Sequence, residues 1–355
     1  MVDYQKALDD YKRKLNSDQV ASSEIIQDLK LGNEPNAKVS YQIDNNGVTV
    51  DQLKTDGTTS LFHDLGADDK NVTAGEIAIG KAGYLYVHIP GNINGNVVTV
   101  TYDNLQNSSY KGQKIAKIVA TIHDVQVDGF DQHRLVISDN PYYGFYQQRL
   151  KQFAVNYTYY DANGQMINFS NNEDDGGAWL SIGSLNSGYY RTEEAQLLSS
   201  GKAYGFYNST VAVHGDNTIY SSDVNELTGD LKIDGPTGRG VTTPSPFLNN
   251  DNKWWDTPAG LEDPNAYLGA GVFNIKGNHA DINFIDETNV NGYMSWFTAS
   301  TIIPKDSFKI TPPSTDVHYH YDVNIQKEEN LILPFSQLIQ LNLCRYFYGF
   351  LFWSI

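Results

Sequence analysis

The chain has almost no cysteine, no excess of positive charge and no opening secretion signal. A single cysteine, Cys344, excludes a disulfide scaffold and a cysteine-based zinc site. The 25 Lys and Arg residues are outnumbered by 42 Asp and Glu residues, which gives a formal net charge of −17. Nucleic acid is therefore not an expected partner, because a phosphate-binding surface needs a basic patch.

Common catalytic signatures are also missing. The sequence contains no HExxH, GxSxG, P-loop or GxGxxG motif. The glycine-rich segment 235–240 lacks the lysine and the strand-to-helix context that a phosphate loop requires. His318 and His320 lie two residues apart, and we interpret them as surface residues of a strand rather than zinc ligands.

The residues that are abundant favour β-structure. The chain has 24 Tyr, 15 Phe, 5 Trp and 30 Gly, a composition that suits strands joined by tight turns. From residue 38 the apolar residues alternate with polar ones. This pattern predicts strands at 39–43, 48–50, 84–89, 97–102, 115–127, 135–138, 178–182, 211–213, 272–275 and 281–285.

Two hairpins are predicted from their turns. Asn45-Asn46-Gly47 separates two alternating runs, and a second hairpin over 153–169 turns at 161–164. The connections are rich in Asn, Gly, Asp and Pro, and no long amphipathic helix interrupts the strands. The predicted fold class is all-β, a large antiparallel β-sandwich of two packed sheets.

The N-terminal residues have a different period. Residues 3–15 predict a short amphipathic helix, and the apolar residues of 25–29 predict a further turn. A helix of this length is marginal by itself in water. We therefore interpret 1–33 as the end of a longer helical stalk.

The remaining domain boundaries follow from composition. We expect the sandwich to occupy 36–312, followed by a linker and the truncated start of another domain at 313–330. Residues 331–355 are hydrophobic, but Gln340, Asn342 and Arg345 interrupt them. We interpret them as an aberrant tail, with a membrane anchor as the alternative.

A Pro-rich stretch at 236–268 provides the candidate ligand-binding residues. Regular structure is not expected there, and long ordered loops that carry aromatic residues are often functional. We predict that Trp254, Trp255 and Tyr267 stack on a sugar, and that Asp256 and Asp263 make polar contacts. The alternative is that at least one of the two Trp rings anchors the loop in the core.

An acidic turn is the candidate metal site. Glu173, Asp174 and Asp175 precede two glycines, and carboxylates on turns provide the oxygen ligands that calcium prefers. No EF-hand spacing is present, so the alternative is a solvated acidic turn.

Four segments in sequence order resemble the variable region of the antigen I/II adhesins, which is shared with the glucan-binding protein C group. They are YKGQKIAKIV at 110–119, the segment 153–169 with NYTYYDANGQMINF, AWLSIGSL at 178–185 and WDTPAGLEDPNAYLGAGVFNIKG at 255–277. The N-terminal YQKALDDYKRKL resembles the last repeat of the family's stalk, and VHYHYDV resembles the entry to its later domains. The Asn and Tyr content resembles lactobacillus members.

This resemblance implies a lectin-like β-supersandwich at the tip of a Gram-positive surface adhesin that is attached to the cell wall in its full-length form. It implies a non-enzymatic head that binds host glycoproteins of the mucin or salivary agglutinin type, or glucans, with a bound metal in some members. The β-domain would not enter a membrane. Two alternatives stay open: a glycoside hydrolase or lyase on a jelly-roll-like scaffold, and a structural spacer.

Overall fold

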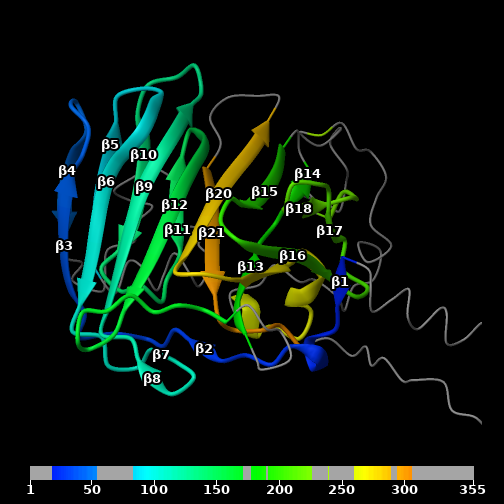
Figure 1. The fold of residues 1–355 in the computed structure, drawn as a ribbon. Helices are drawn as coiled ribbons and strands as arrows, with labels where there is room; N and C mark the ends of the chain where they lie inside the picture. The colour runs from blue at the N-terminus through cyan, green and yellow to red at the C-terminus, as the bar shows by residue number, and fades with distance from the viewer. Residues whose placement is uncertain are drawn as a thin grey trace, which may run out of the picture. The chain divides into compact units, whose positions relative to one another are not determined.

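Two β-sheets stacked face to face make up most of the structure (Figure 1). The computed structural model describes residues 18–53, 83–170, 177–188, 191–225, 239, 260–288 and 294–305. All of them lie in one unit, Met1–Pro313. Within these ranges no helix has the length and apolar character needed to cross a membrane.

The first sheet has the strand order β1-β16-β19-β13-β21-β11-β10-β5-β4. Neighbouring strands are antiparallel except for β1 and β16, which are parallel. The strands are β1 (Gln19–Val20), β4 (Thr49–Leu53), β5 (Tyr84–Ile89), β10 (His133–Ser138), β11 (Phe145–Gln148), β13 (Ala178–Gly183), β16 (Gly201–Phe206), β19 (Gly271–Ile275) and β21 (Met294–Ser300).

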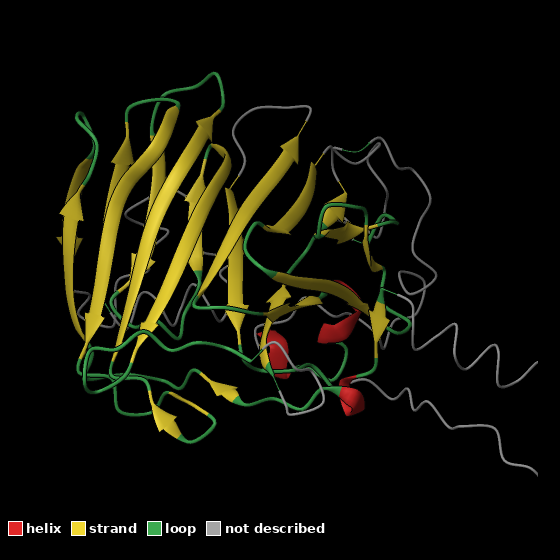
Figure 2. Cartoon of the chain, viewed as in Figure 1, coloured by secondary structure: helices red, strands yellow, loops and turns green. Residues whose placement is uncertain are grey.

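The second sheet has the order β17-β18-β15-β20-β12-β9-β6-β3, with β14 paired to β15. Its strands are β3 (Lys38–Ile43), β6 (Ile93–Asp103), β9 (Lys117–Val127), β12 (Leu150–Tyr160), β14 (Ser187–Gly188), β15 (Arg191–Leu197), β17 (Val211–Val213), β18 (Thr218–Ser221) and β20 (His279–Thr288). A small third sheet contains β2 (Leu29–Lys30), β7 (Ser109–Tyr110) and β8 (Gln113–Lys114). The described residues also form three short helices, red in Figure 2, which are η1 (Ser22–Glu24), η4 (Gly260–Glu262) and η5 (Ala266–Gly269).

The main core lies between the two sheets. Phe145 and Phe297 of the first sheet meet Phe153 and Phe284 of the second, and the ring centroids of Phe284 and Phe297 are 5.2 Å apart. Burying a side chain of this size stabilises the fold by about 1.5–3 kcal/mol. The prediction of an antiparallel β-sandwich is confirmed.

A second apolar cluster covers the outer face of the first sheet. Trp179, Tyr204 and Val272 pack there against Tyr267 and Leu268 of η5. Successive side chains of a strand point to opposite faces of the sheet. Leu180 and Phe273, which are next to Trp179 and Val272, therefore point into the core between the two sheets. This part of the first sheet is therefore buried on both faces.

The hairpin predicted at Asn45-Asn46-Gly47 is wrong in its pairing. The chain does turn there, and Gly47 has a φ of 87°. However, β3 pairs with β6 in the second sheet and β4 pairs with β5 in the first. A turn sequence specifies a reversal of direction, whereas the sheet that each strand joins depends on the partners available.

The hairpin predicted over 153–169 forms only at its turn and over the residues next to it. Gly164 N–H donates to the carbonyl of Asp161 at 3.1 Å, but a single bridge, Tyr160 to Met166, follows in the returning segment before Phe169 bridges Gly277. β9 pairs along one edge of β12, and β20 occupies the other edge as far as Thr158. The returning segment therefore pairs with β12 only at its end, where the N–H of Ile167 donates to the carbonyl of Tyr159 at 2.8 Å.

The helical turn predicted at 25–29 is also wrong. Gln27 forms a bridge with Gly177, and β2 begins at Leu29. The side-chain amide of Gln27 donates to the carbonyls of Trp179 and Thr301. These contacts hold the segment extended against the first sheet. The helix predicted at 3–15 lies outside the described residues, and the predicted domain boundaries stay predictions.

Candidate ligand-binding site

A pocket lined with tyrosines opens between the two sheets. Five segments far apart in the sequence contribute to it: β9, β12, β13, β21 and the loop 139–144. Together with the N-terminal segment they supply Leu31, Ile118, Pro141, Tyr143, Gly144, Tyr157, Tyr159, Leu180 and Ala299. The lining is aromatic and aliphatic, with tyrosine hydroxyls as its polar side-chain groups. The cavity volume is about 10 Å³, room for one water molecule, so a sugar would contact its rim rather than enter it.

Strand alternation on β12 places the aromatic rings of the pocket. Tyr157 and Tyr159 both point to the space between the sheets, and their rings are nearly parallel, 22° apart, with centroids 6.5 Å apart. Phe169 makes an edge contact with the ring of Tyr159, with the ring centroids 5.4 Å apart. Tyr160 follows on the opposite face of the strand, where Lys117 lies over its ring.

Tyr157 and Tyr159 of the pocket stay protonated over a wide pH range. Burial, together with the neighbouring Tyr159 and Tyr102, raises the pKa of Tyr157 well above its usual value of 10. Burial likewise raises the pKa of Tyr159. On the adjacent loop, the pKa of Tyr142 is raised by burial and then by the charge of Glu262. Protonated phenols can both donate and accept hydrogen bonds, which suits the hydroxyl groups of a sugar.

The loop that carries Tyr143 is fixed by Asn140, which is buried. The side-chain oxygen of Asn140 accepts the N–H groups of Glu34 and Tyr142, both at 3.1 Å. Its amide donates to the side chain of Asn33 at 2.8 Å, and its carbonyl accepts the N–H of Tyr143. The backbone of the loop that carries Tyr143 is therefore fixed before any ligand arrives, which reduces the entropy lost on binding.

Glu34 in turn fixes the segment behind that loop. Its carboxylate is 2% exposed and accepts the backbone N–H groups of Gln106 and Asn107, both at 2.7 Å. The hydroxyl of Ser108 donates a third hydrogen bond at 2.9 Å. A buried carboxylate is tolerated only with such donors, so Glu34 is a structural residue rather than an acid or base.

A second polar surface lies on the outer face of the second sheet. Cross-strand register aligns Gln42, Thr99, Thr121, Asn156 and Asp281 in one row over β3, β6, β9, β12 and β20. Short hydroxyl and amide side chains are typical of the solvated face of an antiparallel sheet. This row by itself therefore does not indicate a ligand.

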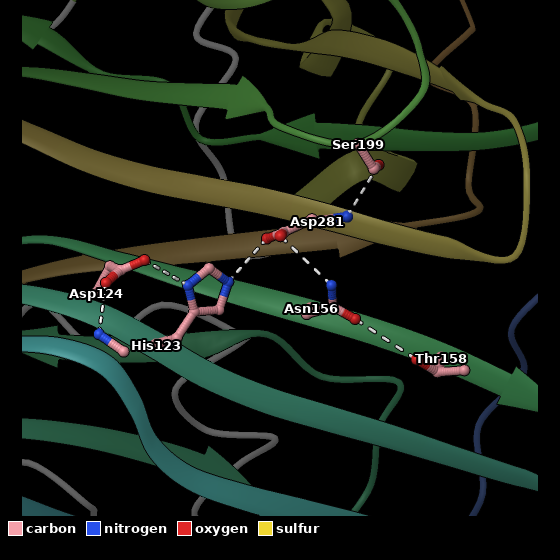
Figure 3. Close-up of polar contacts among 7 residues, drawn as sticks. His123, Asp124, Asn156, Thr158, Ser199 and Asp281 are labelled. Carbon is pink, nitrogen blue, oxygen red and sulfur yellow. Dashed lines mark hydrogen bonds and ion pairs between the residues drawn. The ribbon is translucent and has the colours of Figure 1, made fainter.

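One histidine links three strands on this face (Figure 3). His123 Nε2 lies 3.0 Å from Asp281 Oδ1 on β20, and its Nδ1 lies 2.9 Å from Asp124 Oδ2. Asp124 also accepts the N–H of Gly95 at the irregular part of β6. The hydrogen bond to Asp281, above all, raises the pKa of His123 from 6.5 to about 9, against the lowering effect of burial.

We expect the stability of the domain to fall as this histidine loses its proton. Its raised pKa means that the contribution is complete below about pH 6.5 and is lost as the pH rises to about 9. Asp124 is half exposed, so solvent screening limits the loss to roughly 1–2 kcal/mol. Urea unfolding at several pH values will measure the free energy of unfolding of the wild type and of His123→Gln.

The His123→Gln variant should not show this fall in the free energy of unfolding as the pH rises. His279→Gln is the matched control, because the ring of His279 contacts Asn278 rather than a carboxylate. Equal pH profiles for the wild type and His123→Gln would contradict the assignment.

The candidate ligand residues predicted from the sequence are only partly within the described chain. Asp263 accepts the N–H of Asn265 at 2.7 Å and shapes the turn before η5. Tyr267 is 8% exposed and packs in the outer cluster with Trp179. The structure thus gives both residues a packing or turn-forming role, and their contact with a sugar stays a prediction.

Other predicted residues lie outside the described ranges. They are Trp254, Trp255 and Asp256 of the loop and Glu173, Asp174 and Asp175 of the acidic turn. Among the residues that the structure does describe, no group of three or more His, Cys, Asp or Glu side chains could hold a metal ion. Bound calcium stays a prediction.

The tyrosines of the pocket were missed at the level of sequence. Tyr157 and Tyr159 lie in the predicted strand NYTYYD with the two-residue spacing that puts them on one face. This spacing could be read from the sequence. However, the sequence did not indicate which face of the strand was buried, or that the loop 139–144 would pack against that face.

The family model described as glucan-binding protein C matches residues 12–300. The chain belongs to the glucan-binding protein C family. The matched range includes the pocket, the loop 139–144 and both large sheets, so these are features of a member of this family.

Solved structures agree with the fold. The glucan-binding protein C of Streptococcus mutans superposes with a TM-score of 0.52 at 21% identity, over 88% of each chain. The adhesin domain of PrgB from Enterococcus faecalis gives 0.51 at 20% identity, over 79% of this chain and 91% of that one. The same PrgB domain bound to DNA gives 0.48 at 19% identity, over 76% and 96%. The first two similarities confirm the predicted β-sandwich fold.

Proposed function

We propose that this protein is the binding head of a bacterial surface adhesin that binds a glucan or a mucin-type glycan at the rim of the tyrosine pocket, without catalysis. The observation that carries the proposal is the pocket itself, with Tyr143, Tyr157 and Tyr159 from two segments and a pre-formed loop. Tyrosine faces contact the apolar faces of sugars, and their hydroxyls bind sugar hydroxyls.

Membership of the family supports this choice of ligand. The S. mutans relative is named for glucan binding, and there is evidence that it mediates both sucrose-independent and sucrose-dependent adherence. The net charge of −17 supports a neutral glycan rather than nucleic acid as the partner. Attachment to the cell wall and binding of host glycoproteins such as salivary agglutinin are part of the same proposal.

Replacing Tyr143 with alanine should weaken glycan binding at least about tenfold, because a stacked ring contributes on the order of 1–2 kcal/mol. Tyr157→Phe should weaken it by about three- to tenfold, the effect of one net hydrogen bond. Calorimetry with soluble dextran, and surface binding to immobilised mucin, will measure the dissociation constants. Both titrations should be run with calcium and with EDTA, which tests the predicted metal dependence.

Tyr160→Phe is the matched control for this experiment. It lies three residues from Tyr157 on the same strand but on the opposite face, so binding should be unchanged. Unchanged binding by folded Tyr143→Ala and Tyr157→Phe proteins would show that the ligand binds elsewhere. The loop with Trp254 and Trp255 would then be the next region to test.

A glycoside hydrolase or lyase is the competing function. Hydrolases of this kind use two carboxylates about 5–10 Å apart across the substrate. The described lining of the pocket consists of aromatic, aliphatic, proline and glycine residues, which suits binding better than acid-base chemistry. Release of reducing ends from dextran, abolished by one carboxylate substitution, would overturn the proposal of a non-enzymatic head. Absence of any glycan ligand for the folded domain would favour the spacer.

A further inference from the structure

Both sheets end at the same side of the sandwich, in β3 and β4 (Figure 1). At the opposite ends the edge strands are short: β17 has 3 residues and β1 has 2. β3 is different, because its 6 residues pair with β6 without a bulge. Proteins usually protect such a long, regular edge from other strands with proline, bulges or inward charges.

The free edge of β3 offers an alternating set of backbone groups. Asp44 N–H donates to the carbonyl of Val97 at 3.0 Å, so the even-numbered residues of this strand form the hydrogen-bonded pairs with β6. In an antiparallel ladder the intervening residues point their N–H and C=O groups the other way. These residues are Val39, Tyr41 and Ile43, and no described strand pairs with them on that side.

The same three residues carry apolar side chains. Val39 packs against the main core, whereas Tyr41 and Ile43 are 38% and 44% exposed. They are among the few large apolar side chains that the described surface leaves exposed. Exposed apolar side chains on an unpaired strand indicate an interaction surface.

The sequence of this strand is complementary to itself. If two copies of β3 run antiparallel about a two-fold axis at Tyr41, Val39 lies opposite Ile43 and Ser40 lies opposite Gln42. Lys38 then lies opposite Asp44. Apolar residues thus face apolar ones, polar residues face polar ones, and each Lys faces an Asp.

We propose that β3 is a dimerisation edge, through which a second copy of this chain extends the second sheet across a two-fold axis. The positions of the backbone groups fit this pairing, because the Tyr41–Tyr41 pair and the two Val39–Ile43 pairs are formed by the residues whose N–H and C=O groups point away from β6. Each of these three pairs can exchange two hydrogen bonds, which gives about six. The symmetry also fits, since a two-fold contact requires one self-complementary surface.

Charge strengthens the match. Thr99 Oγ1 and Gln42 Nε2 donate to the carboxylate of Asp44 and hold it on the outer face of the sheet. Lys38 has the same strand parity, so its ammonium group lies on that face too, and the contact contains two opposite-charge pairs. A single strand pair buries less than a standard stable interface, so the dimer is weak and depends on concentration.

Cysteine crosslinking tests the register directly. In a Cys344→Ser background, Tyr41→Cys places two cysteines across the axis about 5.5 Å apart between Cα atoms, within the range of a disulfide. Ile43→Cys is the control: its two copies are separated by about 13 Å, too far to bridge. The full-length chain with Tyr41→Cys should form a covalent dimer on mild oxidation, and Ile43→Cys should stay monomeric.

Charge reversal gives an independent readout by sedimentation velocity at 1–300 μM, a range of about the order expected for a weak contact. Lys38→Asp should shift the wild-type dimer toward monomer at least about tenfold in dissociation constant, and Lys38→Asp with Asp44→Lys should restore it. Thermal unfolding will show that both variants are folded. A monomeric wild type at the highest concentration, equal crosslinking at positions 41 and 43, or no rescue by the double variant would each overturn the proposal.

Discussion

Alanine at Gly144 is expected to destabilise the domain by about 3 kcal/mol or more, and to abolish ligand binding where the protein still folds. A Cβ atom at this position would lie 2.0 Å from the carbonyl oxygen of Phe297 and 3.0 Å from the Cα atom of Thr298. These are backbone atoms of β21, so no side-chain rotation can relieve the overlap. The strands β11 and β21 would have to separate.

That separation would affect the middle of the first sheet. β11 and β21 join the half that contains β13 to the half that contains β10 and β5. Gly144 also lines the tyrosine pocket, so the same displacement would widen it. Guanidinium unfolding will measure the loss of stability, and dextran calorimetry the loss of binding.

Gly91→Ala is the matched control, because a Cβ atom there meets nothing within 4 Å. Its stability should stay within about 0.5 kcal/mol of the wild type, or rise slightly through the reduced entropy of the unfolded chain. A loss below about 1 kcal/mol for Gly144→Ala would mean that the two strands are not as closely packed as the structure shows.

The second large effect is expected for Glu34→Ala, a loss of about 2–4 kcal/mol in the free energy of unfolding. This substitution leaves the N–H groups of Gln106 and Asn107 and the hydroxyl of Ser108 without their buried acceptor. Hydrogen bonds to a charged group contribute more than neutral ones, and unsatisfied buried donors are costly. Urea unfolding will measure the loss.

The loss should extend to ligand binding. The backbone N–H of Glu34 is bonded to Asn140, which fixes the loop carrying Tyr143, so variants that remain folded should bind dextran more weakly. Glu34→Gln should lose less than Glu34→Ala, since its amide oxygen can still accept. Glu262→Ala, at an exposed position, is the control and should leave stability unchanged. Equal stability of Glu34→Ala and the control would refute this account.

The strands that sequence predicted best are those with clear alternation. Tyr84–Ile89 and Val211–Val213 match β5 and β17 to the residue. The hairpins were predicted less well, because the Asn46-Gly47 turn fixes a reversal but not the partner of each strand. The partners available in the folded protein decided that β3 would pair with β6 and that β4 would pair with β5.

The candidate site shows the same division. Sequence indicated the resemblance to a family of adhesins, and the family is now established, but it did not indicate the tyrosines of the pocket. It assigned Tyr267 to sugar stacking, whereas the structure places that ring in a second apolar cluster. Whether an aromatic ring packs in a core or lines a pocket depends on what covers it, and the covering residues are distant in sequence.

The sequence by itself determined the fold class, because the period of two in its apolar residues requires sheets with one buried face. Its acidic charge and missing motifs determined which partners and reactions were not expected. Only the tertiary structure brought Leu31, Tyr143, Tyr157 and Ala299 together around one pocket and left one edge of β3 without a partner among the described strands. Contacts between segments up to about 270 residues apart depend on the order in which strands pair, and local residue patterns do not encode that order.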